Sequence, residues 1–196
     1  LNRRGSSMKL FLGISGKMGS GKTTLTEGIR NSLNTFTSEV VSLAKPIKDI
    51  QHMIYNELDL EMVGEKDRDL LIKLGMWGRD KSPTLWLEQA VKKFKSSPAD
   101  IVICDDVRFG NEAEWFEENG LLIRIEGEQR GTNVDDSKKS DSSETALDEF
   151  DFKYTVNNHS GVENTLMSAL YCVSQHLNVT EQLMDQVARG VVKGGS

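Results

Sequence analysis

The residues with the clearest capacity for chemistry form a glycine-rich run, GKMGSGKT from Gly16 to Thr23, which fits the pattern G-x-x-x-x-G-K-[ST]. Glycines let the backbone curl so that successive N–H groups point at phosphate oxygens, and a following helix presents its positive end to the same anion. In this pattern Lys22 reaches the β- and γ-phosphates and the Thr23 hydroxyl ligates Mg²⁺. The run follows an apolar segment and opens a helical pattern, so it predicts a phosphate-binding loop with ATP and Mg²⁺ as cofactors. The predicted phosphate-binding residues are Gly16, Lys17, Gly19, Ser20, Gly21, Lys22, Thr23 and Thr24.

Two adjacent carboxylates follow the apolar run Ile101 to Cys104. In phosphate-binding folds a carboxylate at the end of such a strand is held near the Mg²⁺ ion. We therefore predict Asp105 and Asp106, together with Thr23, as metal ligands; the alternative is two solvated loop aspartates. Arg108 follows two residues later, where it either bridges to a phosphate or makes a surface ion pair.

Phosphoryl transfer needs positioning and positive charge more than covalent help from the protein. Cationic side chains that suit this demand are scattered over loops and helix starts: Lys17, Lys45, Lys48, Arg68, Arg79, Arg108 and Arg130. The sequence has no N-K-x-D motif, so a small GTPase would lack its guanine-recognition element. The chain is also short for a helicase or a transporter motor. A small kinase remains as the predicted class.

The elements that must position these groups alternate along the chain. Short apolar runs predict strands at 8–15, 39–43, 99–104, 121–125 and 153–156, and helical spacing predicts helices at 22–33, 46–58, 67–74, from 83 onward, 111–119 and 162–177. Gly75 and Gly78 are expected to stop the third of these helices. The alternation predicts a single α/β domain with a parallel sheet over 8–196, after a tag remnant at 1–7. Residues 128–143 are expected to form a mobile loop, and the tail from 180 one more helix.

Composition excludes several classes of protein. The chain has 196 residues, of which 37% are hydrophobic and 28% charged, and a formal net charge of −6. No apolar run approaches the ~18–20 residues of a membrane span, and an acidic chain is a poor non-specific binder of nucleic acid. Cys104 and Cys172 are expected to be buried reduced thiols. We therefore expect a cytoplasmic protein that binds small molecules, as a monomer or a homodimer.

Several stretches together resemble the phage deoxynucleoside monophosphate kinases, with animal phosphomevalonate kinases as distant relatives. They are GISGKMGSGKTT, LAKPIKDI, DLLIKLGMWGRDKSPTLWLEQA, CDDVRFGNEAEWFEENG and SSETALDEFD, and they span Met8 to about Leu177. The resemblance implies a three-layer P-loop NTPase fold of the nucleoside monophosphate kinase type, with a five-stranded parallel sheet and helices on both faces. It also implies transfer of the γ-phosphate of ATP to a deoxynucleoside monophosphate for DNA synthesis.

The same resemblance implies roles for individual residues. Charge on the moving phosphoryl group would be neutralised by Lys22, Mg²⁺ and one or more of Arg79, Arg108 and Arg130. Asn157 and Asn158 would lie at the adenine of ATP. A helical region at about 46–97 would bind the acceptor, and 128–143 would form a lid. The implied acceptor-binding residues are Lys45, Lys48, Arg68, Trp77, Arg79, Asp80, Trp86, Asp106, Arg108, Asn111, Glu112 and Glu144. For Trp86, base stacking and simple core packing both fit the pattern.

Two other functions stay open. A small-metabolite kinase of the phosphomevalonate type would share the fold, but its acceptor has no base, so the aromatic residues would belong to the core. A nucleotide-dependent switch that hydrolyses ATP slowly would need a partner surface. Acceptor-dependent release of ADP separates these alternatives.

Overall fold

The computed structural model describes residues 9–127, 145–159 and 161–177. The chain forms two compact units: Leu1–Val40 with Pro98–Ser196, here termed the sheet unit, and Val41–Ser97, the helical unit. The helical unit coincides with the region predicted to bind the acceptor. The predicted tag remnant, the lid-like loop and the helix from 180 lie outside the described residues, as do Arg130 and Glu144.

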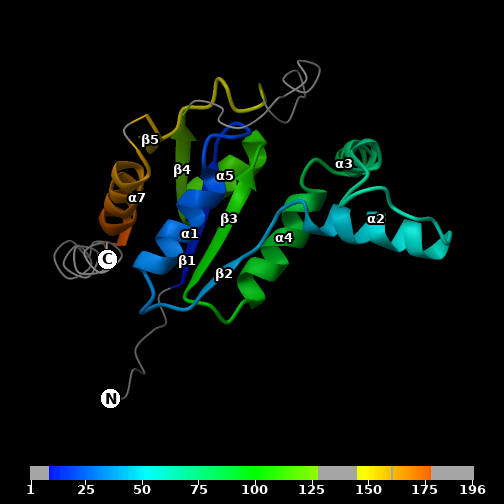
Figure 1. The fold of residues 1–196 in the computed structure, drawn as a ribbon, viewed down its shortest axis with the longest axis horizontal. Helices are drawn as coiled ribbons and strands as arrows, with labels where there is room; N and C mark the ends of the chain where they lie inside the picture. The colour runs from blue at the N-terminus through cyan, green and yellow to red at the C-terminus, as the bar shows by residue number, and fades with distance from the viewer. Residues whose placement is uncertain (1–8, 128–144, 160, 178–196) are drawn as a thin grey trace. The chain divides into compact units, whose positions relative to one another are not determined.

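The sheet unit contains five parallel strands in the order β2-β3-β1-β4-β5 (Figure 1). The predicted five-stranded parallel sheet is therefore confirmed. The strands are β1 (Leu10–Ser15), β2 (Ser38–Val40), β3 (Ile101–Val107), β4 (Leu121–Glu126) and β5 (Thr155–Asn157). β3 continues three residues beyond its predicted end, because it pairs with β1 again at Val107, opposite Ser15, after a register shift between Gly13 and Ser15. Asp105 and Asp106 thus lie within the strand and not in the loop after it.

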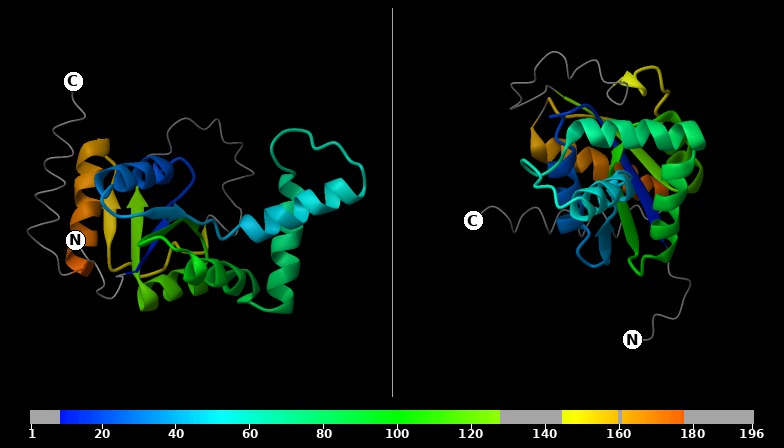
Figure 2. Two further views of the ribbon diagram at one scale, coloured as in Figure 1. Left: turned by 90° about the horizontal axis from the view of Figure 1, so that it is seen from below. Right: turned by 90° about the vertical axis from the view of Figure 1, so that its right-hand side faces the viewer.

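Helices cover both faces of this sheet, as predicted. Helices α1 (Lys22–Ser32) and α7 (Val162–Leu177) lie together on one face, and α5 (Gly110–Asn119) packs on the other (Figure 2). Side chains alternate across a strand, so each strand contributes to both cores. Leu10, Leu12 and Ile14 of β1 belong to the core under α1 and α7. Between them, Gly13 lies against the ring of Phe116 on α5, where an added Cβ would come within 2.6 Å of the ring.

The helical unit consists of α2 (Lys45–Glu57), α3 (Arg68–Lys81) and α4 (Leu85–Ser96). Pro46 in the first turn of α2 agrees with the predicted helix start. Asp67 caps α3 by accepting the amide of Leu70 at 3.0 Å, and the Tyr55 hydroxyl donates to the same carboxylate at 2.8 Å. These two donors lower the pKa of Asp67, the Leu70 amide most. The cap therefore joins α2 to the start of α3.

The prediction that α3 ends before Gly75 and Gly78 is wrong. The helix runs through both glycines to Lys81, and both are buried inside it. The indole N–H of Trp86, on α4, donates to the carbonyl of Gly75 at 3.0 Å. A Cβ on Gly78 would lie 2.3 Å from the same indole. The glycines therefore serve close packing of α3 on Trp86, and the tertiary contact outweighs their low helix propensity.

Replacing Gly78 with alanine is expected to destabilise the protein. Alanine favours a helix interior by roughly 0.5–1 kcal/mol over glycine, but overpacking a fixed core costs about 1–3 kcal/mol. The hydrogen bond to Gly75 fixes the indole, so we expect overpacking to dominate. Urea unfolding would measure the difference. Gly110→Ala is the matched control, because an added Cβ there meets no atom within 4 Å. A Gly78→Ala protein as stable as wild type would contradict this packing.

Candidate active site

The glycine-rich loop connects β1 to α1 and has the backbone that phosphate binding requires. Gly19 and Gly21 have φ angles of 76° and 101°, in the left-handed region that favours glycine. A Cβ on Gly16 would lie 2.6 Å from the Ser20 hydroxyl and 2.7 Å from the carbonyl of Ile125. The three glycines are therefore needed for the turn itself and for close approach to the strand β4.

The start of α1 leaves its amide groups for an anion. Gly21 precedes the helix without a side-chain hydrogen bond to it, and the first turn has no acidic residue. The first-turn N–H groups of a helix have no partner within the helix, and its dipole favours negative charge there. The Ser20 hydroxyl is also buried without a hydrogen-bond partner among the described residues. Phosphate oxygens would satisfy all of these donors, so the residues present fit the predicted ligand.

Lys22 is folded onto the loop. Its Nζ donates to the carbonyl of Gly16 at 2.6 Å and to that of Lys17 at 2.9 Å. Lys22 is partly buried, whereas Thr23 and Thr24 of the first helical turn are exposed. The amine of Lys22 is thus held over the phosphate-binding curve of the loop, with the Thr23 side chain accessible at the start of the helix.

The two predicted carboxylate ligands make different contacts. Asp105 lies on the same side of β3 as α1, and its carboxylate accepts the Thr26 hydroxyl at 3.5 Å. Burial and the neighbouring Asp106 raise its pKa, while the charge of Lys22 acts in the opposite direction. Asp106 turns to the other side, where its carboxylate contacts the Sγ of Cys104 at 3.1 Å. Asp105 is therefore the carboxylate placed beside the phosphate-binding loop.

These residues also fit Mg²⁺. Magnesium is commonly bound by one or two carboxylates together with substrate phosphates and water. Asp105 and the Thr23 hydroxyl supply oxygen ligands of this kind next to the loop. Within the part of the chain that the structure describes, no group of three or more His, Cys, Asp and Glu residues forms a metal site. The arrangement suits a metal that arrives with a nucleotide.

Asn158 is hydrogen-bonded to the glycine-rich loop. Its amide Nδ2 donates to the carbonyl of Ser20 at 2.9 Å, and its Oδ1 accepts the Thr165 hydroxyl at 3.1 Å. The same Nδ2 would lie 2.6 Å from a Cβ on Gly21. Both ends of the Asn158 amide are thus engaged within the protein, whereas Asn157 at the end of β5 is exposed.

A pocket opens beside Asn158. Its lining comes from the end of the loop, the first two turns of α1, β4, the residue after β5 and the start of α7: Gly21, Thr24, Leu25, Gly28, Ile125, Asn158, Val162, Thr165 and Leu166. Most of these are apolar or small, and apolar pockets with a few polar groups hold planar ligands such as bases. The predicted location of adenine next to Asn158 agrees with this pocket and stays a prediction.

The predicted acceptor residues at the start of α5 have different environments. The Glu112 carboxylate is buried and accepts the amides of Arg108 at 2.8 Å and Phe109 at 3.1 Å. It therefore caps the start of α5, a structural role that the sequence pattern did not reveal. Arg108 and Asn111 are partly exposed in the same turn.

Apart from Asp106 on β3 and Glu144 outside the described residues, the other predicted acceptor residues belong to the helical unit. Lys45 pairs with Asp49 at 2.7 Å, and Lys48, Arg68 and Asp80 have exposed side chains. Arg79 is partly exposed. Trp86 is 5% exposed and Trp77 is 54% exposed. The structure accounts for Trp86 by packing against Gly78 and leaves Trp77 as the indole with an open face.

Arg124 is a residue near the loop that the sequence analysis missed. It is 7% exposed on β4, and its Nη1 donates to the Ser15 hydroxyl at 3.2 Å, at the last residue before the loop. The Nη2 lies 3.9 Å from Asp148, and the guanidinium lies over the ring of Phe152. A single arginine inside the apolar run LLIRIE was the signal available, since buried charges need partners.

Solved structures share this fold. A protein named TT1252 from Thermus thermophilus superposes with a TM-score of 0.58 at 16% sequence identity, covering 86% of this chain and 98% of that one. A gluconokinase from Sinorhizobium meliloti 1021 superposes with a TM-score of 0.53 at 13% identity, covering 89% and 98%. Identities this low show the fold alone. With the loop geometry, the fold is a P-loop NTPase fold with a five-stranded parallel sheet and helices on both faces.

A family-level match is more specific. A sequence model described as phosphomevalonate kinase matches residues 14–121, more than half of the chain. The chain belongs to this family. The matched stretch includes the glycine-rich loop, the helical unit and the strand that carries Asp105.

Two further predictions concern the whole chain. Cys104 and Cys172 are both free and buried, and burial raises the pKa of each thiol. Among the described residues, no helix has the length and apolar character needed to cross a membrane.

Proposed function

We propose that this kinase transfers the γ-phosphate of ATP to a deoxynucleoside monophosphate, giving the diphosphate. Transfer of a phosphoryl group is supported by the fold and the family. The proposal of a nucleotide acceptor rests on one observation in the helical unit: the indole of Trp77 is exposed between two lysine side chains.

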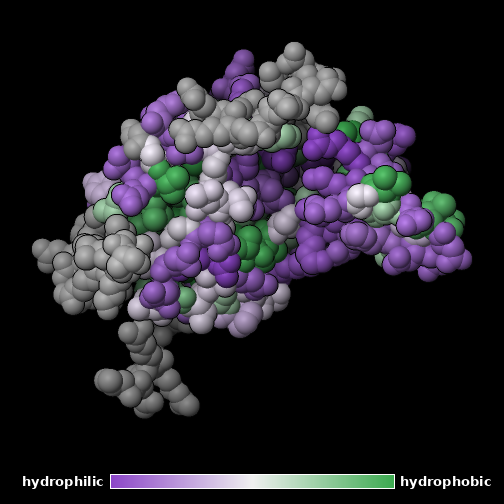
Figure 3. Space-filling view, in the orientation of Figure 1, coloured by the Kyte–Doolittle hydropathy of each residue, from purple (hydrophilic) through white to green (hydrophobic). Residues whose placement is uncertain are grey.

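That indole is Trp77 on α3. Lys73 and Lys81 lie one turn before and after it, at i−4 and i+4, and both are exposed. Ile72 and Met76 are exposed on the same helix. Figure 3 shows apolar residues of the helical unit reaching the surface among hydrophilic ones. An aromatic face suits a base, and ammonium groups beside it suit a phosphate. An acceptor without a base would leave this indole without a role.

The reaction would form a bond between an acceptor phosphate oxygen and the γ-phosphorus while the bond to the β–γ bridging oxygen breaks. Lys22 would turn from the loop carbonyls to the phosphates and neutralise their charge. Asp105 and Thr23 would hold the Mg²⁺ ion, which draws charge from the phosphate oxygens. The arginines Arg79, Arg108 and Arg130 are proposed to stabilise the moving group.

The test is ADP release with Mg·ATP and a panel of acceptors, with a control lacking any acceptor. The panel contains the four deoxynucleoside monophosphates, hydroxymethyl-dCMP, AMP, GMP, CMP, UMP and phosphomevalonate. We expect release that depends on deoxynucleotides. Release indifferent to every acceptor would point instead to a hydrolytic switch.

Trp77→Ala provides the matching mutational test. We expect the KM for the deoxynucleotide to rise about tenfold, because stacking of a base on an aromatic ring contributes ~1–3 kcal/mol of binding free energy. The KM for ATP should be unchanged. Trp77→Phe should keep most of the affinity. Tyr171→Ala is the control, because Tyr171 is also 54% exposed but lies on α7 of the sheet unit. An unchanged acceptor KM in Trp77→Ala would contradict base stacking at this residue.

Phosphomevalonate is the second candidate acceptor, and the family match favours it. It carries phosphate but no base, so Trp77→Ala would then leave the acceptor KM unchanged. If phosphomevalonate were the one acceptor of the panel that gave ADP release with Mg·ATP, phosphomevalonate would replace the deoxynucleotide as the proposed acceptor.

A further inference from the structure

The glycine-rich loop is tied to a distant part of the sheet unit by a chain of charges. Lys17, the second residue of the loop, lies 3.0 Å from the carboxylate of Asp148. Asp148 in turn lies 3.9 Å from the buried guanidinium of Arg124. Asp148 therefore lies between two cations, Lys17 of the loop and the buried Arg124. It is 131 residues from Lys17 in the sequence.

The partners of Asp148 differ in how firmly they are held. Arg124 is anchored by its hydrogen bond to Ser15 and by the Phe152 ring. Among the described residues, Asp148 is the carboxylate that lies within ion-pair distance of Arg124. The Lys17 side chain is 42% exposed. Because a buried guanidinium needs a counter-charge, Asp148 has a reason to stay near Arg124 when Lys17 leaves.

Lys17 has a competing partner whenever the loop is filled. A phosphate-binding loop curls around the oxygens of its ligand, and a lysine within that loop lies near several negative charges. The carboxylate of Asp148 holds the same ammonium group. Hence Asp148 and the triphosphate compete for Lys17.

We propose that Asp148 is a positioning residue that holds Lys17 in the empty loop and exchanges it with the triphosphate. The inference rests on the proposed use of a nucleoside triphosphate at this loop and not on the identity of the acceptor. Asp148 weakens triphosphate binding by the strength of its pair with Lys17, and it stays beside Arg124 when the loop is filled.

The test is the Kd of the non-hydrolysable imido analogue of ATP with Mg²⁺, measured by titration calorimetry. Asp148→Asn removes the competing charge, so we expect the analogue to bind about two- to fivefold more tightly, the range for a partly exposed ion pair. Lys17→Met should bind more weakly than wild type. In the double variant, Asp148→Asn should have no further effect, because its action passes through Lys17.

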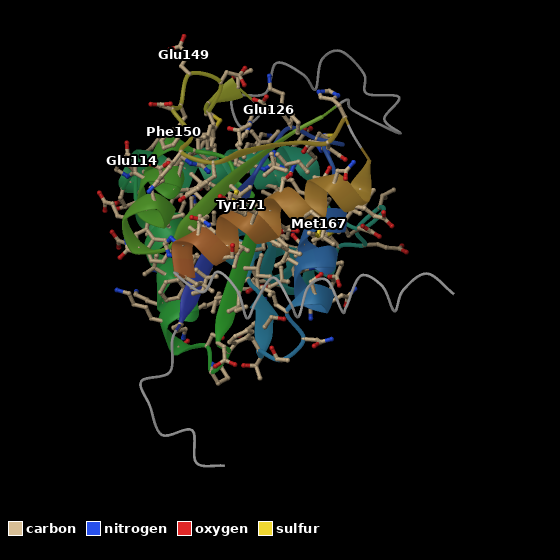
Figure 4. The ribbon with its side chains drawn as sticks, turned by 90° about the vertical axis from the view of Figure 1, so that its left-hand side faces the viewer. Glu114, Glu126, Glu149, Phe150, Met167 and Tyr171 are labelled. Carbon is tan, nitrogen blue, oxygen red and sulfur yellow. The ribbon has the colours of Figure 1, made fainter. Side chains whose placement is uncertain are left out.

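Two controls separate this exchange from other causes. Glu149→Gln removes the same charge one residue away; Glu149 is exposed and points away from the protein in Figure 4, so its Kd should equal that of wild type. Asp148→Glu keeps the carboxylate, so its Kd should be close to that of wild type. A thermal melt of each variant reports any loss of folded protein caused by Arg124 losing its counter-charge.

Three results would overturn the inference alone: an unchanged Kd in Asp148→Asn, an equal tightening in Glu149→Gln, or the same tightening when Lys17 is already methionine. Failure of the unchanged protein to bind the analogue would contradict the proposed function and this inference together. The two failures are therefore distinguishable.

Discussion

Lys22→Met is expected to lower kcat at least a hundredfold, since a group that stabilises transition-state charge is typically worth ~10²–10³ in rate. The side chain is only partly buried and is held over the loop by two carbonyl groups. We therefore expect the variant to fold. Steady-state ADP release with Mg·ATP and the best acceptor would measure the loss.

The matched control for this variant is Lys92→Met, which removes an exposed lysine on α4. Its kcat should stay within a factor of about two of wild type, as for a surface substitution away from any site. Near-normal turnover in Lys22→Met would contradict the mechanism proposed for the loop.

Asp105→Asn is expected to lower kcat about a hundredfold and to raise the Mg²⁺ concentration needed for half-maximal rate. The variant would lose one charged metal ligand, and removal of a single electrostatic group typically lowers kcat by ~10²-fold. Burial raises the pKa of this carboxyl, which means that folding disfavours its charge. A neutral amide in its place should therefore leave the fold intact.

The neighbouring carboxylate makes this prediction specific. Asp106→Asn removes the same charge from the opposite side of β3, so it should leave the Mg²⁺ requirement unchanged and affect acceptor binding instead. Asp151→Asn, at an exposed position, controls for net charge. If Asp105→Asn kept the wild-type magnesium dependence, the metal ligand would have been wrongly assigned.

Much of the fold could be predicted because it depends on local patterns. The five apolar runs became the five strands, and the predicted helix at 162–177 has the same bounds in the structure. Helix ends were less predictable. Gly75 and Gly78 are poor helix formers in any local sense, and their place inside α3 depends on an indole 8 to 11 residues away in the sequence, on another helix.

The candidate site also has features that the sequence predicted and features that it did not. The residues from Gly16 to Thr23 are contiguous, so their spacing alone indicated phosphate binding, and the backbone of the loop has the required geometry. The different contacts of Asp105 and Asp106 could not be predicted, because they depend on β3 continuing to Val107 and on which face of the sheet α1 covers. Glu112 and Asn158 were predicted to face ligands, and the structure adds hydrogen bonds that the sequence did not indicate: Glu112 accepts backbone amides at the start of α5, and Asn158 donates to the carbonyl of Ser20. Their roles toward ligands stay predictions.

The sequence by itself determined the class of protein: a phosphate-binding loop between a strand and a helix, in an α/β chain whose strands are parallel. Local spacing suffices for this, since backbone curvature, helix dipole and strand burial all act over a few residues. Tertiary structure decided which charges act together. Lys17, Asp148 and Arg124 come from three separate segments, and their association depends on strand pairing and on the burial of Arg124. Electrostatic contact acts through space and leaves no periodic trace in the sequence.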